Sequence, residues 1–318
     1  MSEPIRLHTA EIAVELTPDR GADIRSVVHL PSGTSLLFAR ASDSAVQAQD
    51  SHSRWLAGYR GGWQVLCPNA GDESAVDGAT WGFHGEASVV PWQLSEQDAR
   101  SVRLRVDLST APVSLDRTVS LTGSTLRLDE RIANLSPRPI ELMWVHHPAF
   151  GPPFLEPGCR IKVAGATFVA DAEIPGDTTA AGSHGAWPLL ARPDGRVVDL
   201  GLLPPATQPR SVFGYLTELR EGCATITNPR LGLAATLRWP LEVFPYAWVW
   251  QELYASDSFP WHRRAYVAAV EPASTIPQGF AAARAAGGRL VALASGETRD
   301  AWIELSVGTE SRSKSRCR

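Results

Sequence analysis

The sequence predicts an all-β protein with two large antiparallel sheets packed face to face and little helix. Short segments of alternating apolar and polar residues are separated by turn-forming Gly, Pro, Asn, Asp and Ser, as in sandwiches of antiparallel strands. The chain has no GxGxxG after a strand, no P-loop and no GxSxG, which disfavours nucleotide-binding and serine-hydrolase α/β folds. Only residues 279–286, a short alanine-rich stretch, resemble a helix.

The expected strands fall into three groups along the chain. The first two are joined by the turn at residues 18–21, and the polar residues 39–60 that follow are expected to be irregular. A meander then spans residues 88–145, where apolar and charged residues alternate, for example at 126–129. The last group follows a loop-rich stretch, 151–210, which we expect to form the wall or lid of a site. The expected ranges are 5–16, 22–30, 88–94, 102–108, 113–121, 126–134, 140–145, 223–227, 233–239, 246–253, 265–271, 290–294 and 301–307.

Length and composition limit the class of protein. We expect one domain over residues 1–308 and a disordered tail over 309–318, because large all-β folds often form a single unit. The net charge of −4 gives no electrostatic reason to expect nucleic acid, and no apolar run approaches the length of a membrane span. The N-terminus lacks the pattern of a secretory signal, and the four cysteines show no CxxC or zinc spacing. Reduced thiols in a cytoplasmic protein are therefore expected.

Three titratable residues lie in segments that are typical of sites. His147 stands at the end of an apolar strand, before Pro-Ala-Phe, and its neighbour His146 should point to the other face, because side chains alternate along a strand. His84 lies in Phe-His-Gly-Glu, and Glu271 follows the apolar residues 267–270. An isolated histidine is more often a structural residue, so the case for a site rests on the combination.

Four segments in order resemble the aldose 1-epimerase (galactose mutarotase-like) family. They are GGWQVLCPNAG with WGFHGEAS, then RLDERIANLSPRPIELMWVHHPAFG, AAVEPAST, and LVALASGETRDAWIELSV. The resemblance implies a β-supersandwich in which a histidine and a glutamate interconvert the α- and β-anomers of free sugars without a cofactor. By position in these segments, His147 matches the general acid, Glu271 the base, and His84 the second histidine, which helps to hold the ring-oxygen side of the sugar. We assign His146 to packing.

The chemistry fits these residue types independently of the family. Opening a hemiacetal needs a base for the anomeric proton and an acid for the ring oxygen, and no metal or redox cofactor. Candidates for an apolar wall and for polar contacts to the sugar are Trp248, Trp250, Arg60, Asn69 and Gln251. The expected partner is a small-molecule sugar, bound by a monomer or homodimer, with no nucleic acid and no membrane.

The sequence also fits other functions. One is a non-catalytic carbohydrate-binding protein, and another is a different enzyme on the same scaffold that acts on a phosphorylated, sulfonated or oxidised sugar. A metal site formed by His84 and His147 with Glu86 or Glu271 is less favoured, because no HxH or HExxH spacing supports it.

Overall fold

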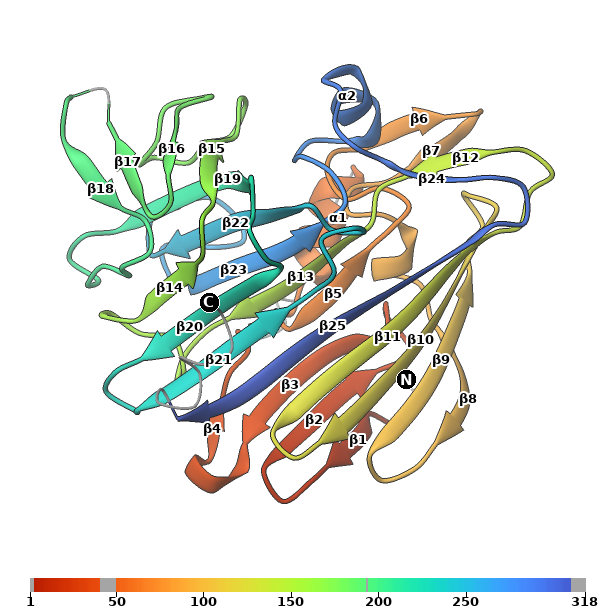
Figure 1. The fold of residues 1–318 in the computed structure, drawn as a ribbon, viewed down its shortest axis with the longest axis horizontal. Helices are drawn as coiled ribbons and strands as arrows, with labels where there is room; N and C mark the ends of the chain where they lie inside the picture. Colours follow the sequence, from red (N-terminus) through yellow and green to blue (C-terminus); the bar gives the residue numbers. More distant parts are fainter. Residues whose placement is uncertain (1–2, 41–49, 193, 310–318) are drawn as a thin grey trace.

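The computed structural model describes residues 3–40, 50–192 and 194–309. In these residues two large antiparallel sheets lie one over the other, with little helix, so the predicted fold class is confirmed (Figure 1). The tail predicted for 309–318 lies outside the described residues, except for Thr309, which ends the last strand.

The sheet nearer the viewer in Figure 1 has eight strands in the order β14-β20-β21-β25-β11-β10-β9-β8. Its central strands alternate buried and more exposed side chains, so the sheet has one apolar face and one polar face. The strands are β8 (Gln93–Gln97), β9 (Ser101–Asp107), β10 (Val113–Thr122), β11 (Thr125–Asn134), β14 (Arg160–Val163), β20 (Cys223–Asn228), β21 (Leu233–Arg238) and β25 (Thr298–Thr309).

The second sheet has eleven strands in the order β1-β2-β3-β5-β13-β23-β22-β19-β15-β16, with β4 paired to β3. Its central strands β13 and β23 are buried at every position, which is typical of strands covered on both faces. The strands are β1 (Ile5–His8), β2 (Ile12–Thr17), β3 (Asp23–His29), β4 (Thr34–Ser35), β5 (Trp63–Leu66), β13 (Val145–Phe150), β15 (Thr167–Ala170), β16 (His184–Ala186), β19 (Arg210–Thr217), β22 (Tyr246–Leu253) and β23 (Tyr266–Ala273).

Smaller elements surround the two sheets. The predicted helix is present as α2 (Phe280–Ala285), and two 3-10 turns are η1 (Leu30–Ser32) and η2 (Glu86–Ser88). Three two-stranded sheets pair β6 (Ser74–Val76) with β7 (Ala79–Trp81), β12 (Ile140–Leu142) with β24 (Val291–Leu293), and β17 (Leu189–Ala191) with β18 (Val197–Asp199).

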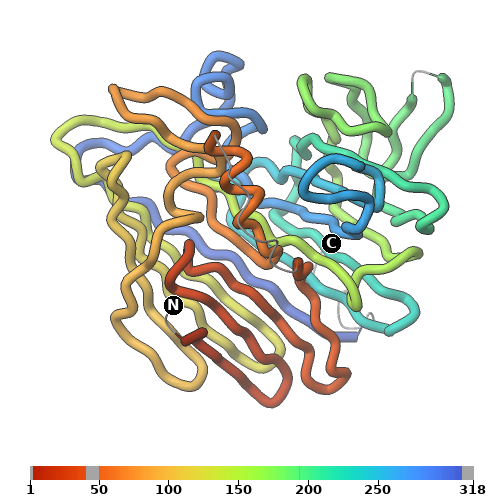
Figure 2. Tube along the Cα trace, turned by 180° about the vertical axis from the view of Figure 1, so that it is seen from behind, coloured from red at the N-terminus to blue at the C-terminus, as the bar shows by residue number. Residues whose placement is uncertain are grey.

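Helix α1 (Ser51–Gly58) was not expected, because residues 39–60 were predicted to be irregular. The Asp50 carboxylate accepts a hydrogen bond from the Ser53 backbone N–H and so caps the helix N-terminus. Figure 2 shows α1, in orange, in front of the eleven-stranded sheet. The helix therefore covers the face of this sheet that points away from the eight-stranded one.

Three predicted strands need correction. The first is 140–145, of which only Ile140–Leu142 forms β12, whereas β13 begins at Val145 and runs on to Phe150. The segment 5–16 is a hairpin of two strands, because the Thr9 hydroxyl accepts hydrogen bonds from the backbone N–H groups of Glu11 and Ile12 and forms a turn. Most of 88–94 is not a strand, since η2 ends there and β8 begins only at Gln93.

The cysteines also depart in part from expectation. Cys67 and Cys159 are free and buried, and burial raises the pKa of the Cys159 thiol to about 11, which makes it unreactive. Cys223 is disulfide-bonded, so the expectation of reduced thiols is wrong for this residue.

Two apolar clusters pack on the eleven-stranded sheet. The larger contains buried side chains of both large sheets and forms the core between them. The smaller contains residues of α1 together with residues of β13 and β23. Its buried members are Phe38, Trp55, Tyr59, Ala149, Ala265 and Val267. Helix α1 and the smaller cluster therefore cover part of the outer face of this sheet.

Candidate active site

A cavity of about 520 Å³ lies where the smaller apolar cluster meets α1, and we call it the cleft. Its lining comes from α1, from the loop that carries His84, from the loop after β15 and from strands β13, β19, β22 and β23. Aromatic and imidazole rings make up much of the lining. They belong to His52, Trp55, Tyr59, Phe83, His84, His147, Phe213, Trp248, Trp250 and Trp261.

Strand register builds the floor of the cleft. Strand β13 pairs with β23 so that Ala149 lies beside Ala269, and the same register sets His147 beside Glu271. Trp248 on β22 flanks Glu271 on the other side. Directly paired residues point to the same face of a sheet, and the His147 Nε2 atom lies 3.8 Å from Glu271 Oε1.

His84 reaches the cleft from the loop after β7. Its ring centroid lies 5.9 Å from that of His147. The His84 Nδ1 atom lies 2.5 Å from the Ala70 carbonyl oxygen, and since a carbonyl only accepts, this nitrogen carries the hydrogen. The other ring nitrogen, Nε2, is left to contact a ligand.

Asn69 holds the loop that carries His84. Its side chain is fully buried, and its Oδ1 atom accepts from the Phe280 backbone N–H. Its amide nitrogen donates to the backbone carbonyls of Gly71, Asp72, Trp81 and Gly82. Gly85 completes the loop with φ of 73°, and an added Cβ would lie 2.4 Å from the carbonyl oxygens of Cys67 and Asn69. Asn69 therefore supports His84 and does not line the cleft, contrary to its predicted contact with substrate.

Helix α1 supplies one wall of the cleft. Trp55 stacks on Tyr59 with ring centroids 4.8 Å apart, and its ring meets His84 edge-on at 4.4 Å. The Trp55 indole N–H donates to the Ser88 hydroxyl at 3.0 Å, which fixes the ring. The sequence signal for this wall was an Asp cap followed by two aromatic residues four positions apart, which share one helix face.

Trp250 and Trp261 supply another part of the wall. Their ring centroids are 5.2 Å apart, and Trp250 lies 5.5 Å from the ring of His147. Trp248 is almost fully buried and donates its indole N–H to the Thr275 carbonyl at 2.7 Å. Trp248 and Trp250 therefore line the cleft as predicted, Trp248 as floor and Trp250 as wall.

Two further predictions about the lining have different outcomes. Arg60 is not among the lining residues, and its backbone carbonyl accepts a hydrogen bond from Arg25, so its predicted contact with substrate is not supported. The loop-rich stretch 151–210 does contribute to the wall, through Asp171 and residues 173–176.

Burial decides the protonation of the floor. It raises the pKa of Glu271 to about 8, lowers the pKa of His147 to about 4, and lowers the pKa of His84 well below its usual range. Between about pH 4 and about pH 8, the pair of Glu271 and His147 therefore holds one proton. Burial favours that proton on the carboxyl, whereas attraction between a carboxylate and an imidazolium 3.8 Å apart favours it on the ring. The balance of these two effects sets which residue of the pair holds the proton.

Three buried polar atoms of the cleft have no hydrogen-bond partner among the described residues. They are the Tyr59 hydroxyl, His147 Nδ1 and Gln251 Oε1. The Gln251 amide nitrogen is already used, since it donates to the Leu200 carbonyl at 2.8 Å. An unmade hydrogen bond of a buried group typically costs about 1–3 kcal/mol, so these atoms indicate a cleft built for a polar ligand.

His146 lies on the other face of β13, as predicted. Its Nε2 atom lies 3.0 Å from the Glu130 carboxylate, and its Nδ1 atom accepts from the Trp63 indole N–H at 3.2 Å. Glu130 also accepts from Trp144 at 3.1 Å and forms a buried ion pair with Arg117. These contacts place His146 in the core between the sheets, away from the cleft.

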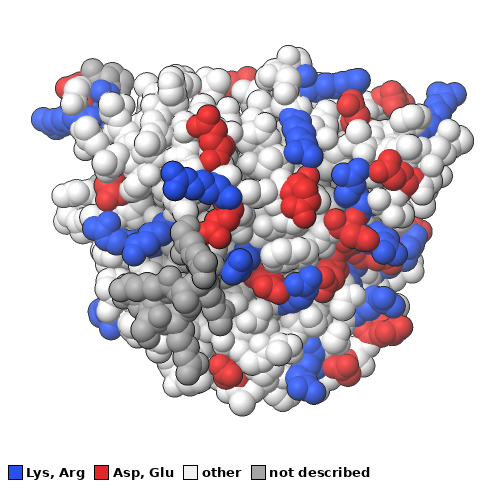
Figure 3. Space-filling model, viewed as in Figure 1, with Lys and Arg blue, Asp and Glu red and all other residues white. Residues whose placement is uncertain are grey.

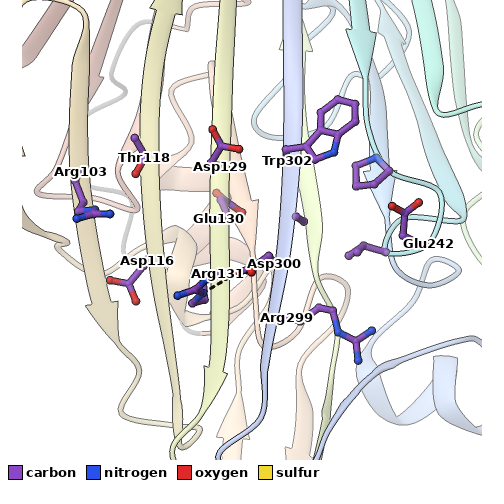
Figure 4. Close-up of a pocket in the computed structure, with 13 residues that line it drawn as sticks. Arg103, Asp116, Thr118, Asp129, Glu130, Arg131, Glu242, Arg299, Asp300 and Trp302 are labelled. Carbon is purple, nitrogen blue, oxygen red and sulfur yellow. Dashed lines mark hydrogen bonds and ion pairs between the residues drawn. The ribbon is translucent and has the colours of Figure 1, made fainter.

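A larger hollow of about 720 Å³ lies on the polar face of the eight-stranded sheet. Figure 3 shows acidic and basic side chains interspersed over this face, and Figure 4 shows Arg103, Asp116, Arg131 and Asp300 across neighbouring strands. These charges pair with one another, as Arg131 does with Asp300 at 2.6 Å and Arg105 with Asp116 at 2.8 Å. We therefore place the candidate site in the cleft and read this hollow as a solvated surface.

The described residues also bear on other classes of protein. No group of three or more His, Cys, Asp or Glu side chains is placed to hold a metal ion. The Glu86 carboxylate, considered earlier as a ligand, accepts hydrogen bonds from Ser109 and Thr110. No helix in this part of the chain is long and apolar enough to cross a membrane.

The fold and the cleft define a galactose mutarotase-like β-sandwich with a histidine and a glutamate on the floor of an aromatic cavity. The chain belongs to the family described as Domain of unknown function (DUF4432), which it matches over residues 2–307. No curated protein matches the chain.

Solved structures with the same fold support this class. The Slr1438 protein from Synechocystis sp. PCC 6803 is 19% identical, with a TM-score of 0.72, 98% of this chain covered and 97% of the other. A putative aldose 1-epimerase from Escherichia coli K12 is 18% identical, with a TM-score of 0.70 and coverage of 96% and 99%. A galactose mutarotase-like protein from Lactobacillus casei is 17% identical, with a TM-score of 0.68 and coverage of 96% and 100%. At these identities the likeness is one of fold.

Proposed function

We propose that the protein is an aldose 1-epimerase, which interconverts the α- and β-anomers of a free aldose by acid-base catalysis. The observation that carries the proposal is the pair of His147 Nε2 and Glu271 Oε1, 3.8 Å apart on the floor of the cleft. The anomeric oxygen and the ring oxygen of a sugar are bonded to the same carbon. An acid and a base that serve both oxygens must therefore be neighbours, as this pair is.

The reaction assigns one role to each residue. The Glu271 carboxylate takes the proton of the anomeric hydroxyl, the bond between C1 and the ring oxygen breaks, and His147 gives its proton to the ring oxygen. The open-chain aldehyde then rotates about the bond between C1 and C2. The reverse proton transfers close the ring on the other face of the carbonyl. His84 offers Nε2 as an acceptor for a sugar hydroxyl on the ring-oxygen side.

The charge of the lining favours an uncharged sugar. None of the described residues that line the cleft is Lys or Arg, whereas Asp72, Asp171, Glu173, Glu252 and Glu271 carry carboxyl groups. A phosphate, sulfonate or carboxylate on the sugar would need a cationic partner to offset its desolvation. This observation counts against the alternative of a phosphorylated, sulfonated or oxidised substrate.

The test is exchange spectroscopy by NMR, with polarimetry on freshly dissolved α-anomers of neutral aldoses. The expected result is faster exchange of at least one neutral aldose and no gain for its 6-phosphate. Saturable binding of a sugar with no gain in exchange would support the carbohydrate-binding alternative and contradict the proposal.

A further inference from the structure

Tyr59 follows the last residue of α1 and lines the cleft. Its side chain is buried, with 2% of the residue exposed. The ring is held on three sides, by Trp55 at 4.8 Å, by His147 at 5.8 Å and by Trp261 at 6.1 Å between ring centroids. These contacts leave the ring little freedom, so its hydroxyl has a fixed position.

That hydroxyl has no hydrogen-bond partner among the described residues, although it is buried. Burial raises its pKa well above the usual value, and Glu271 is the charged neighbour that adds most to the rise. The phenol therefore keeps its proton and remains a hydrogen-bond donor. A native protein rarely leaves such a group unpaired unless a ligand completes it.

The other unpartnered atoms of the cleft are less suited to donate a hydrogen bond to a ligand. Gln251 Oε1 is an acceptor only, and the donor nitrogen of that side chain is bound to Leu200. His147 belongs to the pair that moves the proton. Tyr59 thus provides the unpartnered donor of the described lining that takes no part in the proposed proton transfer.

We propose that Tyr59 is a third catalytic residue, whose hydroxyl donates a hydrogen bond to the anomeric oxygen of the sugar. This role rests on the proposed function. Glu271 takes the proton of that oxygen, C1 and the oxygen form the carbonyl, and the electrons of the broken ring bond leave with the ring oxygen, which His147 protonates. Tyr59 keeps its own proton throughout. Its hydrogen bond strengthens as negative charge gathers on the anomeric oxygen, so it stabilises the transition state more than the bound sugar.

The test is Tyr59→Phe, which keeps the ring and its three contacts and removes only the oxygen. The expected result is a fall in kcat for anomer exchange of about 10- to 100-fold, the range for a hydrogen bond to a charged group, with a smaller change in KM. The melting temperature should stay level or rise, because the variant loses an unpartnered buried hydroxyl.

The matched control is Tyr266→Phe. The Tyr266 hydroxyl is not in the cleft and donates to the Pro204 carbonyl at 2.9 Å, so its loss should lower the melting temperature and leave exchange unchanged. Wild-type exchange by Tyr59→Phe would overturn the role of Tyr59 and leave the proposed function standing. A fall in the melting temperature of Tyr59→Phe without a fall in its kcat would likewise overturn the role of Tyr59. A wild-type protein that speeds the exchange of no sugar would overturn both proposals.

Discussion

His146 and His147 are adjacent residues of one strand, yet they stand in opposite environments. Both ring nitrogens of His146 have partners, in Glu130 and Trp63, within the core between the sheets. His147 Nδ1 has no partner in the described part of the chain, and Nε2 faces Glu271 at 3.8 Å. Both histidines are buried, so burial alone does not separate them.

The difference lies in how completely the two imidazole rings are satisfied, since both nitrogens of His146 have partners and one nitrogen of His147 has none among the described residues. Around His146 the carboxylate of Glu130 accepts hydrogen bonds from His146, Trp144 and Arg117, which stabilises a unique arrangement of the core. Around His147, by contrast, polar atoms of the cleft have no partner among the described residues and are available to a ligand. A histidine with all its partners supports structure, whereas a buried histidine without them indicates a site.

The largest expected effect concerns the core network. Glu130→Ala leaves the Arg117 guanidinium buried without its ion pair, and removing one partner of such a pair costs about 3–5 kcal/mol. Urea unfolding should show this loss at pH 7. The matched control is Arg131→Ala on the opposite face of β11. Arg131 forms a solvent-exposed pair with Asp300, and loss of such a pair costs about 1 kcal/mol or less. Equal losses of unfolding free energy in the two variants would refute the contrast between the buried and the exposed face of β11.

The same carboxylate predicts how stability depends on pH. Burial by itself would raise the pKa of Glu130, but the charge of Arg117, the neighbouring His146 and the hydrogen bonds from both residues outweigh burial and lower this pKa from 4.5 to about 2 in the folded protein. Because the folded pKa is depressed, this contribution is present above pH 4.5 and is lost as the pH falls through about 2. In Glu130→Ala that part of the acid unfolding should be absent.

The next effect concerns the floor of the cleft. Glu271→Gln keeps the shape of the side chain but cannot take a proton, so exchange should fall by about 100-fold or more while sugar binding survives. His147→Ala should lose exchange to a similar extent. Exchange near the wild-type rate in Glu271→Gln, with sugar still bound, would place the base elsewhere.

Stability provides an internal control for Glu271→Gln. The folded pKa of Glu271 is about 8, above its ordinary value of 4.5. The wild-type protein therefore loses stability as the pH rises from about 4.5 through about 8, because ionisation is easier in the unfolded chain. The amide that replaces the carboxyl group cannot ionise, so thermal unfolding at about pH 9 should show the variant to be at least as stable as the wild type.

A smaller effect is expected from His146→Ala. The substitution leaves the Trp63 indole N–H and one Glu130 contact unmade, and an unsatisfied buried group costs about 1–3 kcal/mol. Anomer exchange measured well below the melting temperature should stay within a few-fold of wild type. A loss of exchange as large as that of His147→Ala, in a folded variant, would show that the two faces of β13 act together.

The last prediction concerns how kcat for anomer exchange depends on pH within the wild-type protein. We expect this dependence to be bell-shaped. The active form of the pair of Glu271 and His147 holds one proton, a form present between about pH 4 and about pH 8. Below this window a second proton binds, and above it the last one leaves, so kcat should fall about tenfold per pH unit on either side. A rate that keeps rising beyond about pH 9 would mean that no shared proton is needed.

The sequence by itself determined the fold class, most of the strand positions and the opposite directions of His146 and His147. These follow from local rules, since alternation along a strand and turn residues between strands depend on neighbours in the chain. The same rules did not find the hairpin at Thr9 or helix α1, where a side-chain hydrogen bond or a short capped turn outweighs the composition of the segment.

Only the tertiary structure decided which predicted residues meet. Asn69 and Gln251 are both buried amides, yet Asn69 uses its side chain to hold the His84 loop, whereas Gln251 presents an unpartnered oxygen among the cleft residues. Tyr59 and Trp55 reach the cleft only because α1 packs against strands that lie far away in the sequence. Strand register set His147 beside Glu271, across 124 positions (271 − 147) of the chain. Pairing at such separations depends on how whole sheets assemble, and no local pattern encodes it.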